Sequence, residues 1–301
     1  MPQTTAISPS RETPLDDGGN AVTSVTSDRS LGARRDRYRI GAHGIDATRP
    51  TLPPRAVRVQ TDTLAVQFDA RKTALVVIDM QNDFCTPGGW LHSVGAPVEP
   101  MRKPIAPINR VSAAMRDAAM PVIWLNWGNR PDLLNVPAAV RLPFDLMGEG
   151  IGLSCAQKMN PFAQEALGSR VLEKGSWGAR IVDELEQAAD DIHIDKFRIS
   201  GFPDTGLDSI LRRLGIDTLI FAGVNVDQCV LATLMDATFL GYDAMLLEDC
   251  VATSSPDFCT EAALYNVRTV FGFVSCSERL VRALSSAPGI DDTVLATVDA
   301  T

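Results

Sequence analysis

The chain has 301 residues, of which 45% are hydrophobic and 22% are charged, and its formal net charge at pH 7 is -9. This composition is typical of a globular protein and excludes a fibrous, collagen-like or wholly disordered chain. The excess of acidic residues argues against a broad surface for nucleic acid or anionic membranes, because phosphate binding needs clustered Lys and Arg. We therefore expect neither nucleic acid nor a membrane as a partner.

Residues 1–55 are rich in Ser, Thr, Asp, Arg, Gly and Pro and show no sustained helical or strand period. This composition predicts a polar, disordered N-terminal tail. The segment lacks the basic start and apolar run of a secretory signal, and acidic residues within it argue against an organelle transit peptide. The chain also contains no apolar run of the roughly eighteen residues that a membrane span requires. We therefore expect a cytoplasmic protein.

Residues 55–69 alternate apolar and polar side chains, which indicates a short strand or a strap onto the main body. From residue 73 onward, short runs rich in Val, Ile, Leu and Phe have the length of strands buried on both faces. These runs span residues 73–80, 121–127, 191–197, 217–224, 242–249 and 267–274. Segments with apolar residues at helical spacing span residues 105–120, 204–215, 229–242 and 258–267.

This alternation of strands and helices predicts a mainly parallel sheet with helices packed on both faces, because parallel strands need crossover connections. The fold class is therefore a Rossmann-like three-layer α/β/α sandwich. The whole series fits one domain at residues 56–290, and residues 291–301 are predicted to form a C-terminal tail.

Ligands bind beyond the carboxyl ends of the strands in an open α/β sheet. Asp79 ends the first run, Lys196 ends a later one, and Cys229 follows the run at 217–224 in the first turn of the next helix. A cysteine at a helix N-terminus beside a lysine favours the thiolate, and a neighbouring aspartate can carry its proton. The alternative is structural: a buried cysteine packing as a small hydrophobe, a capping aspartate and a solvated lysine.

Three features carry a resemblance to a known family. They are the string VVIDMQNDF at residues 76–84, Lys196 after an apolar strand, and the string AGVNVDQCVLATLMDA at residues 222–237. With these motifs the chain resembles the isochorismatase-like cysteine hydrolase superfamily over residues 74–284. The resemblance implies a catalytic triad of Asp79, Lys196 and Cys229. In such enzymes the thiolate attacks an amide or ureido carbonyl, the aspartate carries protons, and the lysine supports the charged states.

The same resemblance implies further features around the cysteine. The Val224–Asn225 peptide bond would be cis, and the backbone N–H groups of Asn225 and Cys229 would form an oxyanion hole. Many relatives carry Thr where Val226 stands, so the support of this turn differs here. The resemblance also implies a homo-oligomer.

The number and positions of the cysteines and histidines limit the reactions that the protein can catalyse. The six cysteines contain no CxxC pair and are too irregularly placed for a disulfide scaffold. The superfamily branch that cleaves isochorismate lacks the cysteine nucleophile, so its presence favours C–N hydrolysis. Nicotinamidases bind a metal through an Asp-x-His pair and a further His, whereas residues 124–135 contain no histidine. No GxGxxG motif follows a strand. We therefore predict no metal and no other cofactor, and disfavour nicotinamide as substrate.

Longer segments resemble the ureidoacrylate amidohydrolases of pyrimidine degradation. They are TPGGWL at 86–91, EKGSWGARIVDEL at 173–185, KFRISGFPDTGLDSILRRLGI at 196–216, LLEDCVATSSPDF at 246–258 and AALYNVRTVFGFVS at 262–275. The resemblance implies cleavage of a small ureido acid with release of ammonia. Two alternatives remain: a hydrolase of another small amide, such as biuret or an N-carbamoyl amino acid, and a non-catalytic binding or scaffold protein on the same fold.

Candidate substrate contacts follow the run at 121–127. Asn126 and Asn129 could donate or accept hydrogen bonds, Trp127 and Trp177 could form an apolar wall, and Arg130 could pair with a carboxylate. Each has a structural alternative, since a strand-end Trp often packs in the core and an exposed Arg is often solvated.

Overall fold

The computed structural model of the protein describes residues 29–33, 36–42, 44–49, 52–142 and 169–286. The chain divides into two compact units, residues 1–52 and residues 53–301. The second unit, called the body below, contains all the elements from β4 onward. Within the described residues no helix is long and apolar enough to span a membrane.

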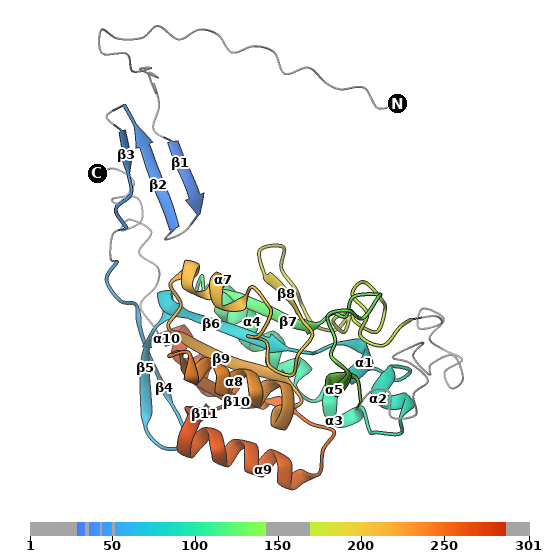
Figure 1. Ribbon diagram of the computed structural model, residues 1–301. Coiled ribbons are helices and arrows are strands. Elements are labelled where there is room, and N and C mark those ends of the chain that lie inside the picture. The colour runs from blue at the N-terminus through green and yellow to red at the C-terminus, as the bar shows by residue number, and fades with distance from the viewer. Residues whose placement is uncertain (1–28, 34–35, 43, 50–51, 143–168, 287–301) are drawn as a thin grey trace, which may run out of the picture. The chain divides into compact units, whose positions relative to one another are not determined.

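The body is built on a six-stranded sheet with the order β11-β10-β9-β6-β7-β8, and every neighbouring pair is parallel (Figure 1). The strands are β6 (Thr73–Ile78), β7 (Val122–Trp127), β8 (Ile192–Lys196), β9 (Thr218–Val224), β10 (Asp243–Ala252) and β11 (Phe273–Ser275). The predicted fold class is confirmed. The chain proceeds from β6 through β7 to β8 and then returns to place β9 on the other side of β6, so the strand order reverses between β6 and β9. A crevice for ligands lies at such a switch point.

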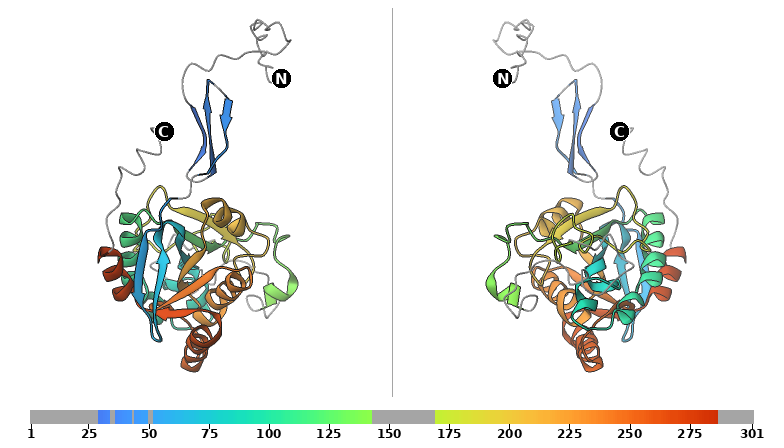
Figure 2. Two further views of the ribbon diagram at one scale, coloured as in Figure 1. Left: turned by 90° about the vertical axis from the view of Figure 1, so that its left-hand side faces the viewer. Right: turned by 90° about the vertical axis from the view of Figure 1, so that its right-hand side faces the viewer.

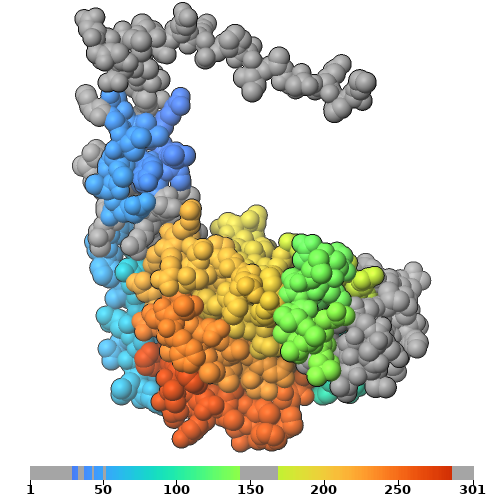
Figure 3. Space-filling view, in the orientation of Figure 1, coloured from blue at the N-terminus to red at the C-terminus, as the bar shows by residue number. Residues whose placement is uncertain are grey.

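Helices cover both faces of the sheet, which explains why β6, β7 and β9 are buried along their whole length. The helices α4 (Ile105–Asp117) and α10 (Ser277–Ser286) pack together on one face, whereas α7 (Leu207–Leu214) and α8 (Leu231–Phe239) lie on the other (Figure 2). The gold to orange-red atoms of α7, α8 and α9 (Asp257–Asn266) form a continuous surface of the body (Figure 3).

Short helical segments complete the body. They are η1 (Ala70–Lys72), α1 (Asn82–Cys85), α2 (Trp90–Ser93), α3 (Glu99–Arg102), α5 (Ala138–Arg141) and the two π-helices η4 (Val226–Val230) and η5 (Val267–Phe271). The predicted strand at 267–274 is therefore wrong for residues 267–271, which are helical. Val267 is buried on the same side of the helix as Ala263, one turn earlier, and the chain stays helical up to Phe271.

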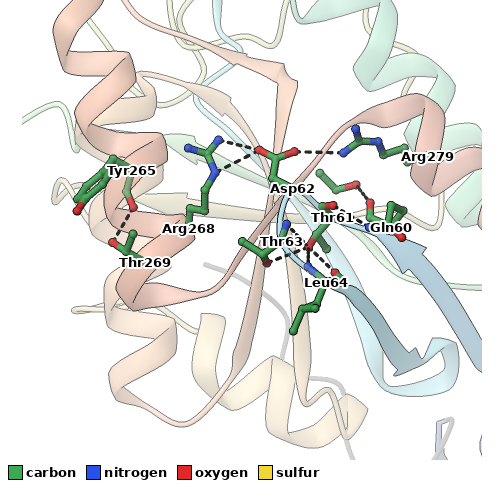
Figure 4. Close-up of polar contacts among 10 residues, drawn as sticks. Gln60, Thr61, Asp62, Thr63, Leu64, Tyr265, Arg268, Thr269 and Arg279 are labelled. Atoms are coloured by element: carbon green, nitrogen blue, oxygen red, sulfur yellow. Dashed lines mark hydrogen bonds and ion pairs between the residues drawn. The ribbon is translucent and has the colours of Figure 1, made fainter.

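The alternating segment at 55–69 forms an antiparallel hairpin of β4 (Ala56–Gln60) and β5 (Ala65–Asp69). Its alternation buries Val57 and Val59, and β4 packs against α10. The tip of the hairpin is held by Asp62, whose carboxylate forms ion pairs with Arg268 at 2.7 Å and Arg279 at 3.1 Å (Figure 4).

The first unit differs from the predicted disordered tail within its described residues. It contains an antiparallel sheet of β1 (Arg29–Ala33), β2 (Asp36–Gly41) and β3 (Gly44–Asp46). The large apolar residues of these strands are too few for a sustained alternating pattern; they are Leu31, Tyr38, Ile40 and Ile45. Cross-strand pairing sets Ile40 beside Ile45 and Arg39 beside Asp46. Residues 1–28 and the predicted C-terminal tail at 291–301 lie outside the described residues.

The close approach of β9 to β6 yields a prediction about Gly223. Its φ is +114°, and a Cβ there would lie 2.0 Å from the carbonyl oxygen of Ile78. We expect Gly223→Ala to lower the free energy of unfolding by about 3 kcal/mol or more, because backbone atoms of a central strand cannot yield. Gly241→Ala is the control, since Gly241 also has a positive φ, of +92°, but open space around it. It should cost about 1 kcal/mol. Urea denaturation measures both, and equal losses would contradict the steric argument.

Candidate active site

Asp79, Lys196 and Cys229 meet beyond the carboxyl ends of β6, β8 and β9. The ammonium of Lys196 lies 2.8 Å from a carboxylate oxygen of Asp79, and the two side chains are 0% and 1% exposed. The thiol of Cys229 is also buried and interacts with both charged groups. The structure therefore brings together the three residues that the sequence predicted as a triad.

The position of Asp79 is fixed by the backbone directly after β6. Its φ is +52°, a left-handed conformation that Asp tolerates better than most residues and that turns the chain sharply. Its N–H donates to the carbonyl of Leu125, and its carbonyl accepts from the N–H of Gln81. The Gln81 side chain then clamps β7, accepting from the N–H of Trp127 and donating to the carbonyl of the same residue, both at 2.8 Å.

Lys196 is held by groups that replace its lost hydration. Besides the ion pair with Asp79, its ammonium donates to the carbonyl of Arg198 at 3.1 Å and lies 4.1 Å from the ring centroid of Trp127. A cation over an indole face is attracted by the ring electrons, more strongly when both are desolvated. The indole N–H of Trp127 donates to Asn129 at 2.7 Å. Trp127 thus contacts the lysine of the cluster, a role that sequence reasoning missed.

Cys229 lies in the π-helical turn η4, whereas the sequence predicted it in the first turn of an α-helix. The Val224–Asn225 peptide bond before this turn is cis, as the resemblance implied. The carbonyl of Asn225 accepts from the N–H groups of Gln228 and Val230, both at 3.1 Å. Helix N-termini leave their first N–H groups without intrahelical acceptors. The turn therefore has backbone donors available beside the thiol.

The Asn225 side chain secures this turn from outside. Its amide oxygen accepts from the N–H of Ser254 at 3.0 Å and from the hydroxyl of Thr253 at 3.2 Å. The same Thr253 hydroxyl lies 2.5 Å from a carboxylate oxygen of Asp227. The segment before α9 thus holds the nucleophile turn, which no sequence signal had indicated.

Burial dominates the electrostatics of the cluster. It raises the pKa of Cys229 to about 12, while the charge of Lys196 opposes the rise and that of Asp79 adds to it. Burial also raises the pKa of Asp79, against the lowering effect of Lys196. At rest the thiol therefore keeps its proton, and the carboxylate beside it is a stronger proton acceptor than an exposed one.

The five residues predicted to contact the substrate differ in burial and in hydrogen-bond partners. Asn126 is 9% exposed at the end of β7, and its amide oxygen has no hydrogen-bond partner within the described residues. Trp127 and Asn129 are buried and bond to each other. Arg130 is exposed and pairs with Asp132 of its own loop, so its guanidinium is not placed at the triad. Trp177 is half-buried, and its carbonyl accepts from Asn82.

Asp83 is a second buried carboxylate near the cluster, and sequence reasoning missed it. Its two oxygens accept the N–H of Trp90 at 3.0 Å and the N–H of Leu172 at 2.7 Å. It thereby joins α2 to the loop that contains Trp177. Burial raises its pKa to about 6, although both hydrogen bonds oppose the rise. The described residues contain no group of three or more His, Cys, Asp or Glu side chains that could hold a metal ion.

The parallel sheet with an aspartate, a lysine and a cysteine together at its carboxyl edge defines an α/β enzyme of the Rossmann-like class. The Isochorismatase domain family matches residues 73–279, more than half of the chain, and the protein belongs to this family.

Solved structures share this fold. A cysteine hydrolase from Pseudomonas syringae pv. phaseolicola 1448A is 23% identical, with a TM-score of 0.61 over 79% of this chain and 100% of that one. An N-carbamoylsarcosine amidase from Thermoplasma acidophilum is 27% identical, with a TM-score of 0.50 over 69% of this chain and 97% of that one. A pyrazinamidase of Pyrococcus horikoshii in complex with zinc is 26% identical, with a TM-score of 0.52 over 68% and 99% of the two chains.

The buried ion pair predicts a large effect of removing one partner. We expect Lys196→Met to lower the free energy of unfolding by about 3–5 kcal/mol, because it leaves the carboxylate of Asp79 buried and uncompensated. The matched control is Lys174→Met, which removes the exposed ion pair with Asp195 and should cost less than about 1 kcal/mol. Denaturant unfolding at neutral pH compares them. Similar losses in the two variants would show that Asp79 is not held as a buried charge.

The raised pKa of Asp83 predicts a pH dependence of stability. The folded state binds a proton up to about pH 6, whereas an exposed aspartate loses it near 3.8. The stabilising contribution of the protonated group is therefore complete below the unfolded pKa and is lost as the pH rises through about 6. Relative to Asp83→Asn, the wild type should lose roughly 2 kcal/mol of unfolding free energy between pH 4 and pH 7. Urea denaturation of both proteins at these pH values tests this, and a constant difference would contradict it.

Proposed function

We propose that the protein is a cysteine-dependent amidohydrolase that cleaves a C–N bond of a small ureido or carbamoyl compound, such as ureidoacrylate, and releases ammonia. The observation that carries this proposal is the buried ion pair of Asp79 and Lys196 with the thiol of Cys229 beside it. A thiol, a proton acceptor and a fixed positive charge are the groups that acyl transfer through an acyl-enzyme needs.

The proposed reaction begins with the neutral thiol. Asp79 takes its proton as the sulfur attacks the carbonyl carbon, and the C–S bond forms while the carbonyl electron pair moves to oxygen. The backbone N–H groups of Asn225 and Cys229 donate to this oxyanion. The C–N bond then breaks, and Asp79 returns the proton to the departing amine. Lys196 stays protonated throughout and balances the charge of the carboxylate and the sulfur.

Water completes the cycle. Asp79 takes a proton from a water molecule while the water oxygen attacks the carbonyl carbon of the acyl-enzyme. The C–S bond then breaks, and Asp79 returns the proton to the sulfur. If the acyl group is a carbamoyl group, the product is a carbamate, which decomposes to ammonia and carbon dioxide. The mechanism needs a free thiol, and Cys229 is free. A reducing cytoplasmic setting is therefore part of the proposal.

Asn126 supports a ureido substrate. Its unpartnered amide oxygen can accept a hydrogen bond from a ureido N–H, and an unsatisfied buried acceptor is costly without a ligand. The similarity to an N-carbamoylsarcosine amidase supports a second candidate within the same chemistry, an N-carbamoyl amino acid, and biuret offers the same N–H groups.

A non-catalytic scaffold is the alternative from a different class. It is disfavoured by the cluster itself. Burying two charges beside a thiol costs desolvation free energy, and apolar residues of similar volume would stabilise such a core at least as well.

The test measures ammonia release from ureidoacrylate, biuret, N-carbamoyl amino acids and nicotinamide. We expect turnover of a ureido or carbamoyl compound and a loss of at least about 1,000-fold in Cys229→Ala, because the nucleophile is gone. Cys259→Ala is the control, since this partly exposed cysteine lies outside the cluster and should keep full activity. Undiminished turnover in Cys229→Ala would overturn the mechanism, and turnover of nicotinamide alone would overturn the substrate class.

A further inference from the structure

A path of contacts leads from a buried carboxylate, that of Asp83, to the ammonium of Lys196 in the triad. Asp83 is 0% exposed, and the reaction proposed above gives it no role. Its oxygens accept the N–H of Trp90 at 3.0 Å and the N–H of Leu172 at 2.7 Å. Within the part of the chain that the structure describes, no cationic side chain pairs with it. Burying a carboxylate without a cation costs desolvation free energy, so packing alone does not explain an aspartate here.

Leu172 is the second member of the path, and hydrogen bonds fix its backbone on both sides. Its N–H donates to Asp83, and its carbonyl accepts from the N–H of Asn129 at 2.7 Å. Its φ is +53°, a left-handed conformation that is unfavourable for a bulky residue. Such a conformation persists only where the surrounding structure enforces it, and it is frequent near functional sites. The two hydrogen bonds of Leu172 supply that enforcement.

Asn129 continues the path to the triad. Its amide oxygen accepts from the indole N–H of Trp127 at 2.7 Å, and the indole ring centroid lies 4.1 Å from the ammonium of Lys196. The hydrogen bond sets the orientation of the ring, and the ring attracts the cation over its face. All the residues of the path are buried. They are Asp83, Leu172, Asn129, Trp127 and Lys196, and they form the contact path referred to below.

The place of the Lys196 ammonium affects the reactivity of Cys229. Its positive charge lowers the pKa of the thiol, against the effect of burial. The ammonium also contacts the carboxylate of Asp79 and the carbonyl of Arg198, while the indole of Trp127 lies against it at the end of β7. A change in the orientation of the ring therefore moves the ammonium relative to the thiol without removing the ion pair.

Asp83 also has a purely structural interpretation. Its own N–H donates to the carbonyl of Gly178 at 2.9 Å, so its contacts hold α1 and α2 against the loop at residues 169–182. If this were its whole role, weakening it would loosen the loop and admit reagents to the site more readily. A displaced ammonium would instead leave the thiol harder to ionise. The two interpretations thus predict opposite changes in the reactivity of Cys229.

We propose that Asp83 is a positioning residue, which fixes the place of the Lys196 ammonium beside Cys229 through the contact path. This inference rests on the proposed function, because the triad is the target of the path. The reactivity of the thiol can nevertheless be measured without a substrate. The positioning role and the proposed function can therefore be tested separately.

The first test measures alkylation of Cys229 by iodoacetamide at pH 8 in the full chain, by mass spectrometry of the peptide that contains this cysteine. Asp83→Asn keeps the side-chain volume but offers one uncharged acceptor oxygen in place of two charged ones, so the bond to Leu172 is weakened or lost. We expect the alkylation rate to fall about fivefold, since below the pKa of a thiol its thiolate fraction changes tenfold for each pKa unit. A rate that is unchanged or faster would overturn the proposal.

The matched control for this test is Ser169→Ala. The Ser169 hydroxyl accepts from the N–H of Gly178 at 3.0 Å in the same loop, but it lies outside the contact path. The control should leave the alkylation rate of Cys229 unchanged, and a fall equal to that of Asp83→Asn would show a general effect of the loop and overturn the proposal. Asp83→Asn should remain folded, because burial already disfavours the charged form of this side chain. Urea denaturation checks the fold of both variants.

A double-mutant cycle tests the contact path itself, because lying between two sites does not prove coupling. Asn129→Leu removes the acceptor of the Trp127 indole N–H at similar volume, and we expect the same fall of about fivefold in the alkylation rate. Adding Asp83→Asn to this variant should lower the rate by less than about twofold more, since the path is already broken. Two independent effects that multiply would contradict the path.

Turnover adds a readout once a substrate is found. In Asp83→Asn we expect kcat to fall about as much as the alkylation rate while KM changes less than about twofold, because the path ends at the triad. A raised KM with unchanged kcat would place Asp83 in substrate binding and overturn the proposal. If no compound is turned over, the proposed function fails, whereas the alkylation rates still decide the role of Asp83.

Discussion

The ion pair between Asp79 and Lys196 is the constraint on which the rest of the site depends. Its two charges lie on strands that are not neighbours, since β7 runs between β6 and β8. The lysine therefore crosses β7, where the indole of Trp127 lies against its ammonium. Because neither charge reaches water, each must find all its partners within the protein. The order of the strands, the sharp backbone turn at Asp79 and the large ring on β7 are all needed for that.

The surrounding hydrogen bonds maintain this arrangement. Gln81 joins the turn after β6 to the end of β7, and Asp83 joins the following helices to the loop at Leu172. Asn225 ties the nucleophile turn to the segment before α9. These polar side chains are themselves buried and hydrogen-bonded, which makes the surroundings of the triad a rigid part of the core. A site built in this way orients its reacting groups before a substrate arrives.

The sequence was sufficient to predict the architecture because the central strands are buried on both faces. Such strands are continuous apolar runs, which are easy to recognise in a sequence. It also placed Asp79, Lys196 and Cys229 at one edge, since topology alone carries strand ends to the same side. The contact of Trp127 with Lys196 could not be predicted, because it depends on a ring orientation across two strands. The helical path of 267–271 was missed because its β-branched residues favour strands locally, whereas packing of Val267 decides the conformation. The strands of residues 29–46 were missed because they contain too few large apolar residues to form a sustained alternating pattern.

The strand order also has a consequence for how the chain acquires its reactive group. Asp79 lies early in the body, and Cys229 follows only after β7, β8 and the three crossover connections from β6 to β9. Contacts between residues so distant in sequence form late, because their loop-closure entropy must be met by the rest of the sheet. Until β9 inserts beside β6, Cys229 lacks both the carboxylate of Asp79 and the ammonium of Lys196. The ability to cleave an amide bond is thus a property of the finished sheet, because only there do the thiol, the carboxylate and the ammonium lie together.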